Sequence, residues 1–411
     1  MENKGAGALK GLVSFIFTIL IIGIIGFVAW FCVDFFGIIE LPKEFSIVEL
    51  ISKYDTYVYE CSANIESKEE IAVQPRKRKI NINNNVMDSG GSLDDVIAQM
   101  DSANNNRRDD NQNQNPINST EFYYSQLNEH SKYIYDEIYK NYENLKSGTY
   151  RIEFGSHFND LLHKENGDNI LNDSFQLALN SLAFDKPELY FINITKMFLY
   201  TEKTSFAGIV RYKHSIGPAS DDNYLSDSFN NEEDTLNGIE SVDRIVDNVL
   251  NGINNQDNEV DKIRQVHDFL IEQCQYSTSK DNKNIYNAYG AINDRAAVCE
   301  GYAKAFKLFL DKMNIESIIA CGTGTNSSGQ VESHAWNYVL VDGIWYAIDV
   351  TWDDPIILGV GTASYASTHK YFLVGSDKIS RDHVENGELI GSLNEQFLFK
   401  YPKLSINDYR E

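Results

Sequence analysis

The chain has 411 residues, 42% of them hydrophobic, and carries a formal net charge of −24 at pH 7. This length accommodates two domains with appendages, and the apolar content allows a sizeable core. The strong negative charge argues against nucleic acid or any other polyanion as the main partner.

An apolar segment, residues 11–33 (GLVSFIFTILIIGIIGFVAWFCV), contains no charged side chain. As a helix it would extend about 30 Å, enough to cross a bilayer, and it is longer than the apolar part of a cleavable signal peptide. Lys4 and Lys10 precede it, whereas Asp34 and Glu40 follow. The positive-inside rule therefore predicts a signal anchor in the cell membrane. Residues 1–10 would form a cytoplasmic tail, and the rest would be extracytoplasmic.

Composition divides the remainder into further segments. Residues 34–74 form a mixed juxtamembrane segment that can hold a helix or a strand pair. Residues 75–118 are rich in Asn and charge and almost lack aromatic residues, which predicts a disordered linker. Residues 119–235 are predicted to form an α+β extension, and residues 236–411 a C-terminal domain. The expected elements are helices in 119–148, 173–184, 237–252 and 257–275 and strands in 188–202 and 206–212.

The five cysteines include no C-x-x-C pair, so a zinc ribbon is not expected, and no acidic cluster has calcium-loop spacing. We expect no metal and no cofactor. A Cys274–Cys321 disulfide stays open from the sequence. His267 lies on the apolar stripe of the 257–275 helix, which favours a hydrogen-bonded core histidine, and Cys274 on the same stripe is expected to be buried.

Cys299 opens a helix in the stretch AVCEGYAKAF. The apolar residues that follow recur at helical spacing: Tyr302, Phe306, Phe309, Leu310 and Met313. In a first helical turn, unpaired backbone N–H groups and the macrodipole favour negative charge and thus the nucleophilic thiolate. Buried free cysteines are common, so this position alone leaves core packing and catalysis both open.

A hairpin downstream decides between them. HAWNYVLV and IWYAIDVTW flank Asp342-Gly343, the strongest short signal for a two-residue turn. In that register Trp336 lies opposite Asp349, so Asp349 is a diagonal neighbour of His334 on the same face, within side-chain reach. A three-residue loop would place His334 and Asp349 on opposite faces.

Cys299, His334 and Asp349 thus supply the parts of a thiol triad. His334 would take the proton of Cys299 and later protonate the leaving amine, and Asp349 would orient the imidazole. The competing interpretations are a strand-end histidine and a structural carboxylate.

These blocks, VCEGYAKAFKLFLDKMNIES, HAWNYVLVDGIWYAIDVTWDDP and HKYFLV, resemble the transglutaminase-like superfamily as found in secreted or membrane-anchored bacterial proteins. The resemblance covers about residues 260–376. It implies an α+β, papain-like core in which the cysteine helix packs on an antiparallel sheet. It also implies Cys299 as nucleophile, His334 as base and Asp349 as the third member. The region from residue 119 resembles the helical extension that often precedes this core.

The family's acyl chemistry also needs a donor to an oxyanion, usually a backbone N–H near the cysteine and a side chain upstream of it. Tyr289 is the candidate side chain here, with packing as the alternative. Trp336 and Trp352 are candidates for lining a substrate channel, although alternating strand aromatics are also typical of a core.

The sequence therefore predicts a membrane-anchored, extracytoplasmic cysteine enzyme that forms a thioester from a peptide or protein amide. An amine would resolve the thioester to a crosslink, and water would give deamidation or proteolysis. The substrates would be cell-surface proteins or wall peptides. The alternative is a catalytically silent adaptor that binds such partners.

Overall fold

The computed structural model describes residues 119–206, 209–219, 224–254, 256–279, 281–354, 365–385 and 399–410, with strand β1 (Ile65–Val73) and positions 22, 25–27 and 30. The predicted linker 75–118 lies outside the described residues, as does most of the predicted span 11–33. Within the described part of the chain, no helix combines the length and the apolar character needed to cross a membrane.

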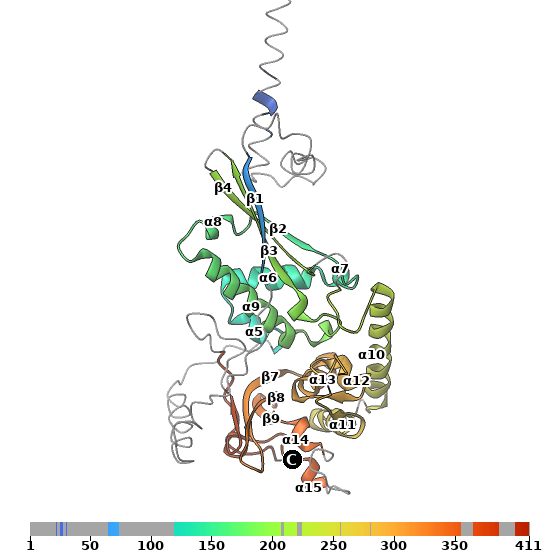
Figure 1. Cartoon of the computed structure of the whole chain (residues 1–411). Helices are drawn as coiled ribbons and strands as arrows, with labels where there is room; N and C mark the ends of the chain where they lie inside the picture. The colour runs from blue at the N-terminus through green and yellow to red at the C-terminus, as the bar shows by residue number, and fades with distance from the viewer. Residues whose placement is uncertain are drawn as a thin grey trace, which may run out of the picture. The chain divides into compact units, whose positions relative to one another are not determined.

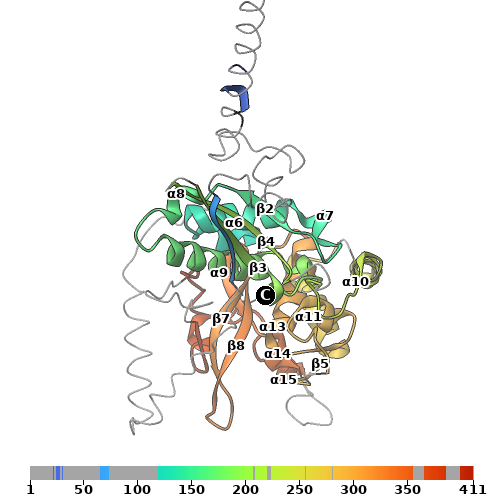
Figure 2. The same cartoon turned by 45° about the horizontal axis from the view of Figure 1, so that its top comes forward.

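The chain divides into two compact units, of which the first comprises residues 1–72, 153–168 and 199–216. Its centre is a four-stranded sheet in the order β1-β3-β4-β2 (Figure 2). The elements besides β1 are β2 (Ile152–Gly155), α8 (Asn159–Leu162), β3 (Phe198–Phe206) and β4 (Ile209–Gly217). The strand predicted over 188–202 begins only at Phe198, because Pro187–Leu189 and Ile194–Lys196 form 3-10 turns (η3 and η4).

The second unit comprises residues 73–152, 169–198 and 217–411 and holds the predicted triad. Its first part is helical: η2 (Ser119–Glu121), α5 (Phe122–Ser125), α6 (Glu129–Lys140), α7 (Tyr142–Leu145), most of α9 (Gly167–Asp185), α10 (Glu232–Gly252) and α11 (Glu259–Gln273). Asparagine side chains begin several of these helices, because a short amide oxygen accepts the exposed first-turn N–H. The caps are Asn128 for α6, Asn231 for α10 and Asn258 for α11.

The C-terminal part of this unit is built on an antiparallel sheet in the order β10-β7-β8-β9. Its elements are β5 (Gln275–Tyr276), α12 (Ala288–Ile292), β6 (Ala296–Ala297), α13 (Cys299–Lys312), β7 (Ser317–Thr325), β8 (Val331–Val341), β9 (Ile344–Ile348), α14 (Val350–Asp353), α15 (Tyr365–Thr368), α16 (Ser376–Ile379) and β10 (His383–Glu385). Helix α13 lies beside β7 and β8 (Figure 1) and also packs on α11, α12 and α14. The α+β class with an antiparallel sheet and a packed cysteine helix agrees with the sequence prediction.

The buried face of α13 forms the centre of this unit, as its apolar spacing predicts. Tyr302, Phe306 and Phe309 are all fully buried. A buried polar bond fixes the helix to the sheet, since the Asn337 side chain on β8 donates to the Ala303 carbonyl at 3.0 Å. Helix α13 and the sheet are therefore held as one body, so the positions of residues at their ends are fixed relative to each other.

Candidate active site

Helix α13 begins at Cys299, as the spacing of its apolar residues predicts. The residue before it, Val298, has no side-chain group that can accept a hydrogen bond from the first turn. The first-turn N–H groups are therefore not capped from that position, and their partial positive charge lies next to the thiol. Cys299 is a half-buried free thiol.

The hairpin that carries the histidine and the aspartate has the predicted register. Val341 pairs with Ile344 and Asn337 with Ile348. Asp342 and Gly343 both have positive φ, 51° and 77°, as a type I′ turn requires. The two-residue turn is therefore confirmed, and the alternative three-residue loop is excluded.

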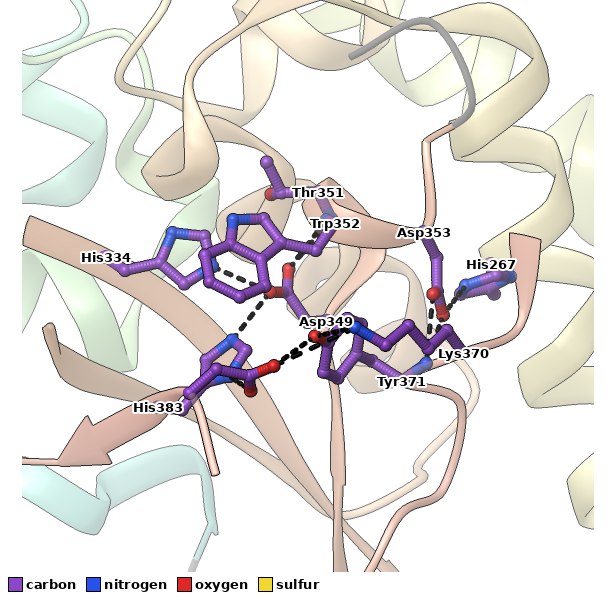
Figure 3. Close-up of polar contacts among 10 residues, drawn as sticks. His267, His334, Asp349, Thr351, Trp352, Asp353, Lys370, Tyr371 and His383 are labelled. Carbon is purple, nitrogen blue, oxygen red and sulfur yellow. Dashed lines mark hydrogen bonds and ion pairs between the residues drawn. The ribbon is translucent and has the colours of Figure 1, made fainter. Parts of the chain in front are cut away.

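Asp349 follows directly after β9 and is the N-cap of the short helix α14. Its Oδ1 accepts the backbone N–H groups of Thr351 at 3.0 Å and Trp352 at 3.1 Å. These two bonds fix Oδ1 to the backbone, so Oδ2 is the oxygen that can accept a hydrogen bond from a histidine side chain. His334 Nε2 lies 2.7 Å from this Oδ2 (Figure 3).

The thiol of Cys299 lies close enough to His334 to act on the pKa of its imidazole. Because Nε2 faces Asp349, Nδ1 is the ring nitrogen available to the thiol. Burial acts to lower the pKa of His334, but the charge and hydrogen bond of Asp349, with a smaller contribution from Cys299, raise it to about 10. The imidazole therefore favours its protonated form between a carboxylate and a sulfur.

Asp349 is completely buried. Burial alone would raise its pKa, but His334 and, to a lesser extent, His383 hold it well below the usual range of a carboxyl group. The group is therefore an anion, which can orient and stabilise an imidazolium.

His383 is a member of this group that the sequence reasoning did not include. Its Nε2 lies 2.9 Å from Asp349 Oδ2 (Figure 3). Its Nδ1 lies 2.8 Å from Asp382 Oδ1. The Tyr371 hydroxyl donates to Asp382 at 2.5 Å. No motif marks His383, because it reaches the site only through the pairing of β10 with β7, which places it opposite Gly324.

The two tryptophans proposed as substrate-channel residues contact the imidazole instead. Trp336 is 1% exposed and stacks on His334 at a ring separation of 5.9 Å. Trp352, which is half-buried, lies 4.9 Å from His334 and 4.4 Å from His383. A Cβ at Gly324 would lie 2.7 Å from the Trp352 ring, so glycine there makes room for the indole. Trp336 is therefore a packing residue, and the channel role proposed for it is incompatible with its burial.

Tyr289, the predicted oxyanion donor, is a residue of α12, and its ring lies among aromatic side chains from other segments. Its ring is 5.1 Å from Phe229 and 5.9 Å from Tyr190. The ring of Tyr289 is thus packed against aromatic side chains, which was the alternative interpretation of this residue. These contacts offer no support for an oxyanion role. Another aromatic residue near the nucleophile is Tyr276, which lies in β5 beside Ala297 of β6, two residues before Cys299.

Tyr276 is 37% exposed, and burial followed by the charge of Cys299 raises its pKa to about 12. Its hydroxyl is therefore protonated at neutral pH and can donate a hydrogen bond. One sequence signal could have located Tyr276. It directly follows the predicted 257–275 helix, in an extended segment that lies between this helix and Cys299 in the sequence.

The other described cysteines are buried and form no disulfide. Cys274 and Cys321 are 1% and 8% exposed, and neither forms a disulfide, so the open alternative of a bridge between them is not realised. Burial raises the pKa of Cys274 to about 12. Cys274 is thus the buried small residue that the helical stripe predicts.

Two groups of side chains in the described ranges bring possible metal ligands within 4.8 Å of one another. They are His334, Asp349 and His383, and His267, Asp268 and His369. The first group is buried within the site just described, where both histidines contact one carboxylate oxygen. His267 is fully buried and hydrogen-bonded, as expected for a core histidine.

Comparison with known proteins agrees with this geometry. The family described as the transglutaminase-like superfamily matches residues 247–350, a range that contains Cys299, His334 and Asp349. The chain carries a transglutaminase-like domain. The chain is 20% identical to kyphoscoliosis peptidase of Mus musculus over 138 residues and to that of Homo sapiens over 137 residues. Each match covers 30% of this chain and 21% of the peptidase, so it spans about a fifth of those relatives.

This chain is also similar to a protein whose solved structure is described as a crystal structure of a TGase. The two share 16% sequence identity with a TM-score of 0.26, over 42% of this chain and 48% of the TGase. The superfamily predicted from the three sequence blocks is supported by the family match over residues 247–350.

Proposed function

We propose that the transglutaminase-like domain is a cysteine acyltransferase or amidohydrolase whose nucleophile is Cys299. The observation that carries the proposal is the position of His334, which is hydrogen-bonded to the buried carboxylate of Asp349 and lies beside the thiol of Cys299. A histidine between a thiol and a carboxylate is the arrangement that activates a nucleophilic cysteine.

In the proposed reaction the thiolate of Cys299 adds to the carbonyl carbon of a peptide or protein amide. The carbon–nitrogen bond then breaks, and His334 transfers its proton to the leaving nitrogen, which departs as ammonia or an amine. The resulting thioester is attacked by a primary amine or by water, whose proton His334 accepts as the carbon–sulfur bond breaks. The first acceptor gives a crosslink, and the second gives deamidation or peptide cleavage.

We assign the oxyanion donors to the backbone N–H of Cys299 and to the hydroxyl of Tyr276. The first group belongs to the nucleophile itself, and Tyr276 pairs with Ala297, two residues before Cys299, and feels the charge of Cys299. Tyr276→Phe should therefore lower kcat by about 100-fold, a loss typical of one oxyanion donor. The hydroxyl of Tyr289 serves as the matched control, and Tyr289→Phe should leave kcat near the wild-type value.

The first test is site-resolved alkylation with iodoacetamide, followed by peptide mass spectrometry, in the full-length chain held in detergent. Cys299 should label rapidly at pH 6 to 7, and His334→Ala should lose this reactivity. The buried Cys274 and Cys321 are internal controls in the same sample, since both should stay unlabelled. Equal and slow labelling of Cys299 in the wild-type protein and in His334→Ala would overturn the assignment.

A second measurement separates the enzyme from a silent adaptor of the same fold. A glutamine-containing peptide is incubated with a fluorescent primary alkylamine, and both amine incorporation and ammonia release are followed. Turnover that is lost in Cys299→Ser supports the enzyme and distinguishes transfer from hydrolysis. A reactive Cys299 without turnover on protein or peptide amides would favour an adaptor that binds cell-surface proteins or wall peptides.

We also propose that residues 11–33 anchor the domain on the outer face of the cell membrane. The support is the uncharged length of this segment and the lysines before it. The chain should resist extraction by alkaline carbonate, and an external protease should degrade the C-terminal part in intact cells. Protection of that part until the membrane is lysed would place the domain inside.

A further inference from the structure

A second histidine–carboxylate cluster lies outside the Cys299–His334–Asp349 group. His267 and Asp268 are on α11, and His369 directly follows α15. Asp268 Oδ1 lies 3.0 Å from His267 Nδ1 and 2.9 Å from His369 Nε2. Two imidazole nitrogens and one carboxylate oxygen thus converge from separate elements on one point.

The far nitrogen of each ring is held by another group. His267 Nε2 lies 3.3 Å from Asp353 Oδ2, and His369 Nδ1 lies 2.9 Å from the Thr368 hydroxyl. The Asp353 carboxyl group is itself held in place, since it accepts the backbone N–H of Tyr371 on both oxygens (Figure 3). Such outer partners fix the ring and the tautomer of metal-binding histidines, and they direct a lone pair toward the metal.

We propose that His267, Asp268 and His369 form a binding site for a divalent transition-metal ion, for which Zn²⁺ is the best fit. Two nitrogens and one oxygen suit Zn²⁺, whereas Ca²⁺ and Mg²⁺ prefer oxygen ligands throughout. Ligand atoms around a tetrahedral Zn²⁺ lie about 3.3 Å from one another, given metal–ligand distances of about 2.0 Å. The 2.9 and 3.0 Å separations found here approach that value. The Asp268 side chain is 36% exposed, which gives an ion access from solvent.

The ion would connect three parts of the fold. Asp353, which holds His267, ends the helix α14 that Asp349 begins, and His369 leads into the segment that contains Tyr371. Metal at this position would fasten α11 to α14 and to the chain after α15. Its role is structural, and it supplies no group to the reaction at Cys299.

The test uses the full-length chain in detergent, freed of metal with EDTA and then equilibrated with ZnCl₂. Zinc per chain is measured by mass spectrometry after gel filtration, and affinity by calorimetry. We expect one zinc per chain, with affinity at least about 100-fold weaker in Asp268→Asn and in His369→Ala, because even outer partners contribute about 10–100-fold. His383→Gln, in the other cluster, is the matched control and should keep the zinc.

Circular dichroism of the metal-free proteins checks that the variants fold, and Asp268→Asn keeps the shape of the side chain if His369→Ala does not fold. Substitution with Co²⁺ adds a spectroscopic readout, which should show ligand-field bands without a thiolate charge-transfer band. Absence of stoichiometric zinc in the wild-type chain would overturn the proposal. Equal binding by Asp268→Asn, or loss of zinc only in His383→Gln, would overturn it too.

Discussion

His383 contacts Asp349 through the same carboxylate oxygen that His334 contacts, at 2.9 Å against 2.7 Å. Asp349 Oδ2 is therefore held from two strands, β8 and β10. The second histidine limits the positions that the carboxylate can adopt, so we expect it to act as a positioning residue for His334.

Replacement of His383 should weaken catalysis without removing the nucleophile. A hydrogen bond to a charged group contributes about 1.5–3 kcal/mol, so His383→Leu should lower kcat by about 10–100-fold. His383→Gln, whose amide can still donate, should recover part of the loss. The alkaline limb of the pH profile should also move upward in His383→Leu, because a carboxylate with one donor fewer attracts the proton of His334 more strongly. An unchanged limb with an unchanged kcat would contradict the positioning role.

Asp349→Asn should have a much larger effect than His383→Leu. The amide lacks the charge that raises the pKa of His334, and it can present an N–H to the imidazole and select the wrong tautomer. In a comparable triad such a change costs about 10⁴-fold in kcat. Steady-state rates of amine incorporation measure the loss, and alkylation of Cys299 at pH 6 should slow in parallel. Fast alkylation in Asp349→Asn would show that the carboxylate does not support the pair.

The rate of thioester formation should have an alkaline limb near pH 10. His334 must be protonated to give its proton to the leaving nitrogen, and Asp349 raises its pKa from 6.5 to about 10 against the opposing effect of burial. The protonated form thus persists from pH 6.5 through the neutral range and is lost as the pH approaches 10. Single-turnover rates between pH 7 and 11 measure the limb. A decline already complete near pH 7 would mean that His334 titrates as an ordinary histidine.

The buried Asp185 should make the free energy of unfolding fall as the pH rises from 4 to 7. Burial raises its pKa to about 7, although backbone N–H groups of Tyr123 and Tyr124 act to lower it. The native state thus binds a proton that the unfolded chain has released above about pH 3.9, so this stabilisation is complete below that pH and lost toward pH 7. The slope is at most about 1.4 kcal/mol per pH unit.

Chemical denaturation of the wild-type protein and of Asp185→Asn at several pH values isolates this contribution. The amide cannot ionise, so the difference between the two free energies of unfolding should change with pH in this range. A difference that stays constant from pH 4 to 7 would mean that Asp185 is ionised in the native state.

The sequence was most informative where local chemistry determines geometry. The type I′ turn at Asp342 and Gly343 fixes the register of β8 and β9, and that register brings His334 to Asp349. The start of α13 at Cys299 follows from apolar spacing in the same way. Turn type and helical periodicity are short-range properties, which can be recognised in one sequence.

What could not be predicted depends on pairing between distant segments. His383 reaches Asp349 because β10 pairs with the far side of β7, and no residue near His383 indicates that pairing. Tyr276, which we propose as an oxyanion donor, was missed for a similar reason, since a two-residue parallel bridge pairs it with Ala297, two residues before Cys299. Tyr289 was a plausible alternative until the contacts of α12 with Phe229 and Tyr190 placed its ring in the packing.

The turn between β8 and β9 has a practical consequence for engineering. It is on the surface, where Ile344 is 46% exposed, and a short exposed turn is an obvious place to insert a tag or a label. A single added residue here would shift β9 by one position and move the side chain of Asp349 to the opposite face of the sheet. An insertion at this turn would thus disconnect the carboxylate from His334 while leaving every residue of the site in the sequence. Tagged forms of this protein should carry the added residues elsewhere.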